Sequence, residues 1–391
     1  MIFLRRGSRP GPLPSALAAV LLAIISLGGR GARAEPAFAV RTGYRCSQCH
    51  FNRTGGGLRN SFGSLYLQTV LPQRQLHWRE GGNLLPADPD ARFTIGADGR
   101  FQWLNIAPPR GARVSSLEIP EANIYAEGRL VPGWLSVYLD AKGGPGGASA
   151  RELFALLSAQ KWNAYLKAGK FLLPFGWRLP DDSAYIRQFT SFSYLTPDIG
   201  LEMGIEPGRW SAHLAITNGT AGGSENNRSK QFSFLGVRRF SIWRVGLSGS
   251  NNIAGGIRTT QAGLLGGANF GRLTLLGEID RREEHGRLAP AGGVTGGPTE
   301  VATRHQLISL LEADLLVSRG IDIKFTHDWI DPDRNVRTDS RVRDSLGVEY
   351  IPYPFLQLRV FYRRSDGPPP SVTGFEGSRN KQVDLEAHMF F

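Results

Sequence analysis

The stretch LQLRVFYR at residues 356–363 decides the fold, because apolar and mostly polar side chains alternate along it. The two sets are Leu356, Leu358, Val360 and Tyr362 on one side and Gln357, Arg359, Phe361 and Arg363 on the other. Successive side chains of a β-strand point to opposite faces, so a period of two predicts a strand with one apolar face. The same period recurs throughout residues 92–391, for example at 135–140 and 321–326. A soluble β-sandwich would show this alternation too, so the connections have to decide.

Short and long connections alternate along residues 92–391. The short ones are 131–133, 161–163, 207–209, 240–242, 270–272, 318–320 and 352–354. The longer ones, rich in Gly, Pro or charge, lie near 107–116, 142–150, 172–197, 218–230, 252–258, 282–303, 331–341 and 365–379. Outer-membrane barrels have short periplasmic turns and long extracellular loops. The alternation predicts an all-β fold, a transmembrane antiparallel β-barrel of about 16 strands in the bacterial outer membrane, with both termini periplasmic.

The final residues, 383–391, repeat the alternation and end in Phe391. The apolar positions are Val383, Leu385, Ala387 and Met389. This ending resembles the C-terminal recognition signal of bacterial outer-membrane proteins. It is also consistent with one more amphipathic strand that happens to come last.

A second motif, Cys46-Ser47-Gln48-Cys49-His50, contains both cysteines of the chain. C-x-x-C-H is the attachment signature of c-type haem. The two thiols add to the vinyl groups of the porphyrin, and His50 binds the iron as proximal ligand. A redox dithiol, a disulfide or half of a zinc site would also use two cysteines. The adjacent histidine and the absence of other cysteines favour one covalent haem c.

The first 34 residues predict export. Arg5, Arg6 and Arg9 precede an apolar run at 16–27, and Ala32-Arg33-Ala34 offers a cleavage site, so residues 1–34 are interpreted as a signal peptide. No later apolar stretch approaches 18 residues, which excludes a helical membrane protein. The formal net charge of +12 alone would be consistent with a nucleic-acid partner. An exported chain with scattered arginines predicts lumen and rim charge instead, in an anion-attracting pore, and no nucleic acid.

Residues 35–91 do not follow the strand rhythm and are interpreted as a monohaem cytochrome c segment with a linker. Asn60 predicts the N-cap of a helix at 61–70. So short a segment cannot shield a haem and also form its own core, whereas a barrel of this size leaves an aqueous lumen. We therefore predict a lumen plug, with the haem inside the barrel or at its periplasmic mouth. The expected surroundings are the lumen-facing residues Arg359, Phe361, Arg363, Glu386 and His388.

The N-terminal motifs together carry a family resemblance. Residues 36–43 (PAFAVRTG), followed by 46–51 (CSQCHF) and 60–63 (NSFG), resemble the fused monohaem cytochrome–porins of the outer membrane. The best-known members are iron oxidases of neutrophilic and acidophilic iron-oxidising bacteria. The resemblance implies a haem segment fused to a 16-stranded porin with Fe(II):cytochrome c oxidoreductase activity. Extracellular Fe(II) would be the donor, and a periplasmic cytochrome c or another electron carrier the acceptor.

Two stretches differ from that family and leave the donor open. The Gly55-Gly56-Gly57 insert and Ser64-Leu65-Tyr66 depart from the iron-oxidase pattern. Residues 169–176 (GKFLLPFG) resemble a phosphate-selective type of porin. Two alternatives therefore stand beside electron transfer: a passive porin with a haem-bearing plug, and the barrel of a conduit that contains a multihaem cytochrome.

The sixth ligand of the haem iron and an external metal site have only weak sequence signals. His77 is the remaining histidine near the motif and a candidate distal ligand, beside a lumen-facing barrel residue or an open position. Met203 and Met389 lie far away in predicted strands. Oxygen ligands suited to Fe(II) occur in or beside long loops. They are Asp181-Asp182, Glu283-Glu284-His285, and Asp328 with Asp331 and Asp333, although Asp331-Pro332-Asp333 is also a turn sequence.

Overall fold

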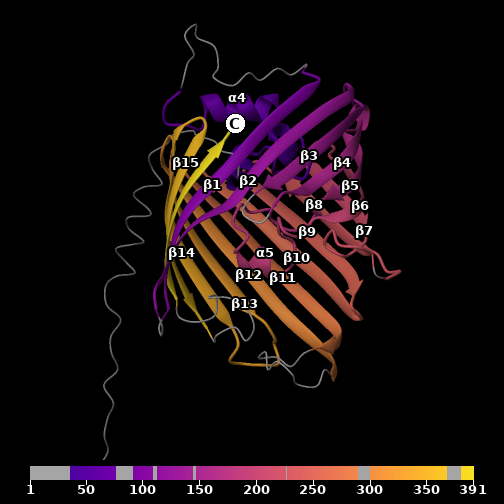
Figure 1. Ribbon diagram of the computed structural model, residues 1–391, viewed down its shortest axis with the longest axis vertical. Helices are drawn as coiled ribbons and strands as arrows, with labels where there is room; N and C mark the ends of the chain where they lie inside the picture. Colours follow the sequence, from indigo (N-terminus) through magenta and orange to yellow (C-terminus); the bar gives the residue numbers. More distant parts are fainter. Residues whose placement is uncertain are drawn as a thin grey trace, which may run out of the picture.

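Sixteen antiparallel strands in the described part of the chain close into one barrel, in which β16 pairs with β1 (Figure 1). This computed structural model describes residues 36–75, 91–108, 112–143, 147–225, 227–288, 300–367 and 380–391. The predicted fold class and strand number are confirmed. The predicted signal peptide (1–34) and His77 lie outside the described residues.

All strands pair with their sequence neighbours. Their bounds are β1 Phe93–Ala107, β2 Val114–Val131, β3 Leu135–Gly143, β4 Ser149–Ala159, β5 Ala164–Phe171, β6 Asp198–Ile205, β7 Trp210–Thr217, β8 Gln231–Arg239, β9 Trp243–Ala254, β10 Ile257–Phe270, β11 Leu273–Leu288, β12 Glu300–Ser318, β13 Ile321–Asp331, β14 Arg341–Tyr353, β15 Leu356–Asp366 and β16 Lys381–Phe390.

The alternation places apolar side chains outside the barrel and most polar ones inside. In β7, for instance, Leu214 and Ile216 are exposed, whereas His213 and Thr217 are buried. An outward apolar band of this kind fits a bilayer rather than water. Exposed tryptophans also lie at the end of the barrel where the short turns are, which we call the short-turn end. Outer-membrane barrels have a girdle of aromatic residues at such a membrane interface. The exposed tryptophans are Trp134, Trp162, Trp210 and Trp243.

The predicted short turns all join consecutive strands, but two predicted loops are wrong in extent. The link expected at 252–258 is only Gly255-Gly256, between β9 and β10. Both glycines have positive φ, +59° and +78°, which a tight two-residue hairpin requires. The loop expected at 282–303 shrinks because β11 continues to Leu288 and β12 begins at Glu300. Strand pairing here continues into the region predicted as loop.

Residues 36–75, which we call the N-terminal segment, lie at the short-turn end of the barrel. The segment contains α2 (Pro36–Thr42), α3 (Cys46–Cys49) and α4 (Ser61–Thr69). Figure 1 shows α4 at the same end as the C-terminus. The Gln73 backbone N–H donates to the Ile351 carbonyl (2.8 Å), and the Arg319 Nε donates to the Pro72 carbonyl (2.8 Å). No described helix is long and apolar enough to cross a bilayer.

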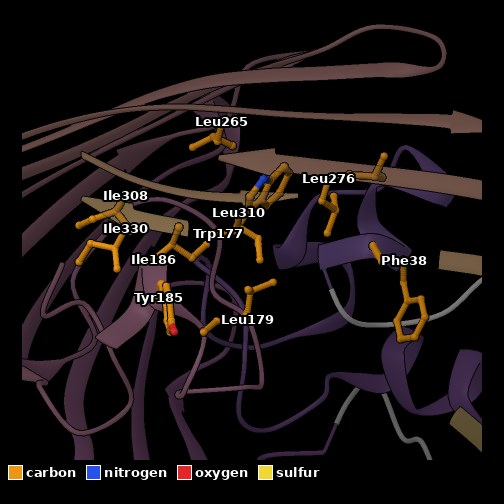
Figure 2. Close-up of a cluster of buried hydrophobic side chains, with 13 residues drawn as sticks. Phe38, Trp177, Leu179, Tyr185, Ile186, Leu265, Leu276, Ile308, Leu310 and Ile330 are labelled. Atoms are coloured by element: carbon orange, nitrogen blue, oxygen red, sulfur yellow. The ribbon is translucent and has the colours of Figure 1, made fainter. Parts of the chain in front are cut away.

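Residues 172–197, which we call the inner loop, connect β5 to β6 and fold against the inner wall. Their short helix α5 (Tyr185–Gln188) packs on β11–β13. The inner loop and α2 share a buried apolar cluster with the wall, where Figure 2 shows Trp177 and Tyr185 among strand side chains. The cluster consists of Ala37, Phe38, Val40, Trp177, Leu179, Ala184, Tyr185, Ile186, Leu265, Leu276, Ile308, Leu310 and Ile330. This part of the lumen is thus a packed core.

Candidate functional site

Cys46, Cys49 and His50 line one cavity inside the barrel. Its empty volume is about 1220 Å³, part of which opens to solvent. The N-terminal segment forms one side, and the inner loop contributes Phe175 and Trp177. The remaining wall comes from β7–β10. The structure therefore brings the whole C-x-x-C-H motif to a single enclosed space.

The short helix α3 sets the relative positions of the motif residues. The Arg45 N–H donates to the Gln48 side-chain oxygen (2.8 Å) at its start. His50 leaves the helix in extended conformation, while its N–H still donates to the Cys46 carbonyl (3.0 Å). Both cysteines are free thiols. One helical turn thus presents two thiols and an imidazole to the same cavity.

The His50 ring has a defined tautomer. Its Nδ1 lies 3.3 Å from the Gly57 carbonyl oxygen, which can only accept, so Nδ1 carries the proton and Nε2 keeps its lone pair. Burial, and secondarily the charge of Arg59, lowers the pKa of His50 to about 4. The imidazole is therefore neutral at pH 7, the form that binds iron. Burial also raises the pKa of Cys49, to about 11. The neighbouring Cys46 raises this pKa further, and the charge of Arg59 lowers it.

The glycine insert shapes the chain around the motif. Gly55, Gly56 and Gly57 have φ of +92°, +83° and +65°, a region that residues with a Cβ rarely adopt. A Cβ on Gly55 would lie 3.2 Å from the Cys46 sulfur. The insert therefore turns the chain tightly past Cys46 and delivers the Gly57 carbonyl to His50.

Helix α4 packs directly on the motif, and its predicted N-cap is confirmed. The Asn60 side-chain oxygen accepts from the Gly63 N–H (2.9 Å), and the Asn60 N–H donates to the Cys49 carbonyl (3.0 Å). A Cβ on Gly63 would lie only 2.1 Å from that same carbonyl oxygen. Glycine at 63 is what lets the helix approach Cys49.

We expect Gly63→Ala to displace α4 from Cys49. Overpacking against backbone atoms costs about 1–3 kcal/mol, so trypsin should cut at Arg53 and Arg59 in the folded barrel. Gly99→Ala is the matched control, because nothing lies within 4 Å of a Cβ on Gly99. Equal trypsin resistance of Gly63→Ala and the wild-type protein would contradict this packing.

Buried polar contacts tie the N-terminal segment to the inner wall. The Asn52 side-chain nitrogen donates to both carboxylate oxygens of Glu152 (2.9 Å each), and Lys167 donates to the Asn52 oxygen (3.1 Å). The Ser47 hydroxyl donates to Glu206 (2.8 Å). Arg41 forms a buried ion pair with Asp322 at 3.5 Å. The segment is thus anchored at several points around the barrel.

Arginines surround the cavity and give it a positive field. The lining contains Arg45, Arg53, Arg178, Arg239 and Arg244. Arg178 donates to the Gly55 carbonyl (2.6 Å), and Arg244 donates to the Ala39 carbonyl (2.9 Å). Guanidinium groups pair with carboxylates, and a haem carries two propionates. The thiols, the unprotonated Nε2, the apolar wall and the arginines fit a covalently attached haem.

The five lumen residues expected around the haem border other cavities than the one that the cysteines line. Arg359 and His388 border a neighbouring cavity that His50 also reaches. Phe361, Arg363 and Glu386 line a different cavity beside the inner loop, where Arg363 donates to Asp181 (2.6 Å). None of the five lines the cysteine cavity. The inner loop lines that second cavity together with β15 and β16, whereas the strands that line the cysteine cavity are β7–β10.

Several residues that line the cysteine cavity were not expected from the sequence. The inner loop contributes Trp177 and Arg178, and β7 contributes His213. The sequence could have indicated that His213 points into the lumen, because it occupies a polar position on the inward face of an alternating strand. No sequence pattern places Trp177 and Arg178 in the lumen, because a long loop can lie inside or outside a barrel.

The structure also shows where the other candidate ligands lie, those for the haem iron and those for an external metal ion. Met203 and Met389, the methionines of the described residues, are exposed on the outer face and cannot reach the lumen. Glu283, Glu284 and His285 lie within β11, so their expected place in a loop is wrong.

Among the acidic candidates, Asp328 and Asp181 pair with arginine. Asp328 is buried and accepts from two nitrogens of Arg343 (3.1 and 2.9 Å). Asp181 pairs with Arg363. Burial alone would raise the pKa of Asp181, but the charges of Arg363 and Arg343 lower it below its usual value. The described residues hold no group of three or more His, Cys, Asp or Glu that could bind a metal ion.

Comparisons with known proteins support the fold. No protein-family profile matches the chain, and no curated protein matches it. An anion-selective porin from Comamonas acidovorans superposes with a TM-score of 0.59 at 12% identity, over 76% of this chain and 99% of the porin. OmpT of Vibrio cholerae, in a trimer form, gives 0.58 at 10% identity, over 77% and 100%. Salmonella typhi OmpF gives 0.56 at 11% identity, over 76% and 97%.

The chain has the porin fold of outer-membrane proteins. At these identities the likeness concerns the barrel architecture alone. The described N-terminal segment precedes the barrel strands, and its contacts with the wall come from this chain's own residues.

Proposed function

We propose that this chain is an outer-membrane barrel that carries one haem c on its N-terminal segment and transfers electrons across the outer membrane. The supporting observation is the enclosure of Cys46, Cys49 and His50 in one arginine-lined cavity of the barrel. Both termini would be periplasmic, at the end with the short turns.

The residues present have separate roles in this proposal. Cys46 and Cys49 would hold the haem through thioether bonds, and His50 Nε2 would bind its iron. Arg178, Arg239 and Arg244 would pair with the propionates. The bound haem supplies one-electron redox chemistry. The inner loop contributes Phe175 and Trp177 to the apolar part of the cavity wall.

One cofactor cannot span the apolar band of an outer-membrane barrel, which is about 25 Å tall, so the proposal requires partners at both ends. The N-terminal segment faces the short-turn end, where a periplasmic cytochrome c or another electron carrier would dock. At the long-loop end the partner would be extracellular Fe(II), or a multihaem cytochrome if the chain is part of a conduit.

A passive porin with a haem-bearing plug is the second candidate. The porin fold favours it, as does the way the N-terminal segment fills one end of the lumen. Redox chemistry separates the two functions. Rapid reduction of the purified protein by Fe(II) in stopped flow supports the oxidoreductase. A haem that dithionite reduces but Fe(II) does not, in a protein that conducts ions, supports the porin.

The haem itself has a direct test. A denaturing gel of the wild-type protein should show haem peroxidase staining at its own mass, since thioether bonds survive denaturation. The double variant Cys46→Ala/Cys49→Ala should lose all staining. Ser47→Ala, which changes the intervening residue, should keep it. A wild-type band without staining would end the cytochrome proposal and leave the porin.

A further inference from the structure

His213 is a wall residue of the cysteine cavity. It lies in β7, is 6% exposed, and lines the same cavity as Cys46, Cys49 and His50. Because β7 alternates, its register directs His213 into the lumen while Ala212 and Leu214 are exposed. A buried imidazole therefore borders the cavity from the wall, while His50 borders it from the N-terminal segment.

A hydrogen-bond chain defines the tautomer of His213. The Tyr165 hydroxyl donates to Glu202 at 2.5 Å, and Lys167 holds the same Glu202 oxygen at 2.9 Å. A phenol has one proton, so the contact of 2.7 Å between the Tyr165 oxygen and His213 Nδ1 requires Nδ1 to donate. Nε2 then carries a lone pair. This is the tautomer of His50, and a second-shell acceptor on Nδ1 is typical of a metal-bound histidine.

The other described histidines fit a ligand role less well. His388 borders the adjacent cavity, which neither cysteine lines. Its Nδ1 contacts Gln357 (3.3 Å), and its Nε2 faces Asp98 at 3.9 Å. His285 and His305 lie in β11 and β12 and contact Thr303 and Glu283, and His327 contacts Asp344. None of these three lines the cysteine cavity.

We propose that His213 is the second axial ligand of the haem iron, bound through Nε2 opposite His50. This inference rests on the proposed attachment of haem at Cys46 and Cys49. It makes the ligand set bis-histidine and divides it between the N-terminal segment and the barrel wall. The iron is then a cross-link between them, and Tyr165, Glu202 and Lys167 position the wall ligand.

The test is the spin state of the ferric iron in the purified full-length protein. Electron paramagnetic resonance and visible absorbance should show a low-spin bis-imidazole haem in the wild type. His213→Ala should lose the low-spin signal and become high-spin, and added imidazole should restore it. His388→Ala is the matched control and should remain low-spin. Tyr165→Phe should stay low-spin with a raised midpoint potential, because the ligand loses the acceptor that increases its basicity.

Failure of the inference and failure of the proposed function give different results. An unstained wild-type band on the denaturing gel overturns both. A stained, folded His213→Ala protein that remains low-spin overturns His213 as ligand and leaves the cytochrome intact. A wild-type protein that is high-spin would also rule out His213 as ligand. So would a low-spin signal that is lost in His388→Ala and kept in His213→Ala. Folding of each variant is checked by the mobility shift of the unheated barrel.

Discussion

Deletion of residues 36–75 should raise the ion conductance of the barrel several-fold. The N-terminal segment lies at the short-turn end, where Arg319 and the Ile351 carbonyl hold its last residues. A 16-stranded barrel without a plug leaves an aqueous channel. Single-channel conductance in a planar bilayer measures the change. The lumen arginines should make the opened pore select anions.

The matched control for the deletion separates the effect of the N-terminal segment from that of the proposed haem. Cys46→Ala/Cys49→Ala removes the two thiols but keeps the segment, so its conductance should stay near that of the wild type. The opened pore should still be narrower than an empty barrel, because the inner loop remains fixed at Trp177, whose backbone N–H donates to Glu278 (2.6 Å). A wild-type conductance equal to that of the deletion variant would show that the segment does not obstruct the lumen.

Local periodicity was enough to predict the barrel but not the ends of its strands. A period of two depends only on which face each side chain takes, so β7 and β15 are readable from residue types alone. Strand ends depend on hydrogen bonding between neighbours. Glu283 and Glu284 look like loop residues, yet they pair with His305 and Arg304 in the ladder. The Gly255-Gly256 turn likewise replaces a loop that composition predicted to be longer.

The chemistry of the candidate site was predictable from the sequence, but the wall residues that surround it were not. C-x-x-C-H specifies thiols and an imidazole by itself. The wall that surrounds them comes from distant parts of the chain, as in the Asn52–Glu152 and Ser47–Glu206 contacts, which join residues 100 and 159 positions apart. The cysteine cavity lies against β7–β10, whereas the inner loop packs on β11–β13 and pairs with Arg363 of β15. No local pattern in residues 172–197 indicates that this loop turns inward.

Lys167→Met should be the most destabilising single substitution at the site. Lys167 and Glu202 form an ion pair of 2.9 Å in which both side chains are 0% exposed. Lys167 also bonds the Asn52 oxygen of the N-terminal segment (3.1 Å). Removing one partner of a buried pair leaves an uncompensated charge and costs about 3–5 kcal/mol. The expected result is a lower denaturation midpoint in urea and easier proteolysis of residues 36–75.

Two further variants decide whether the unpaired charge of Glu202 causes the loss of stability in Lys167→Met. Lys230→Met breaks the Lys230–Glu225 pair, in which Lys230 is 41% exposed, and should cost less than about 1 kcal/mol. The double variant Lys167→Met/Glu202→Gln should recover much of the stability, because the introduced amide is neutral and its carbonyl oxygen still accepts from Tyr165. A double variant as unstable as Lys167→Met would mean that the lost contact to Asn52 dominates. The stability of the wall and the position of the N-terminal segment would then both depend on the Asn52 side chain.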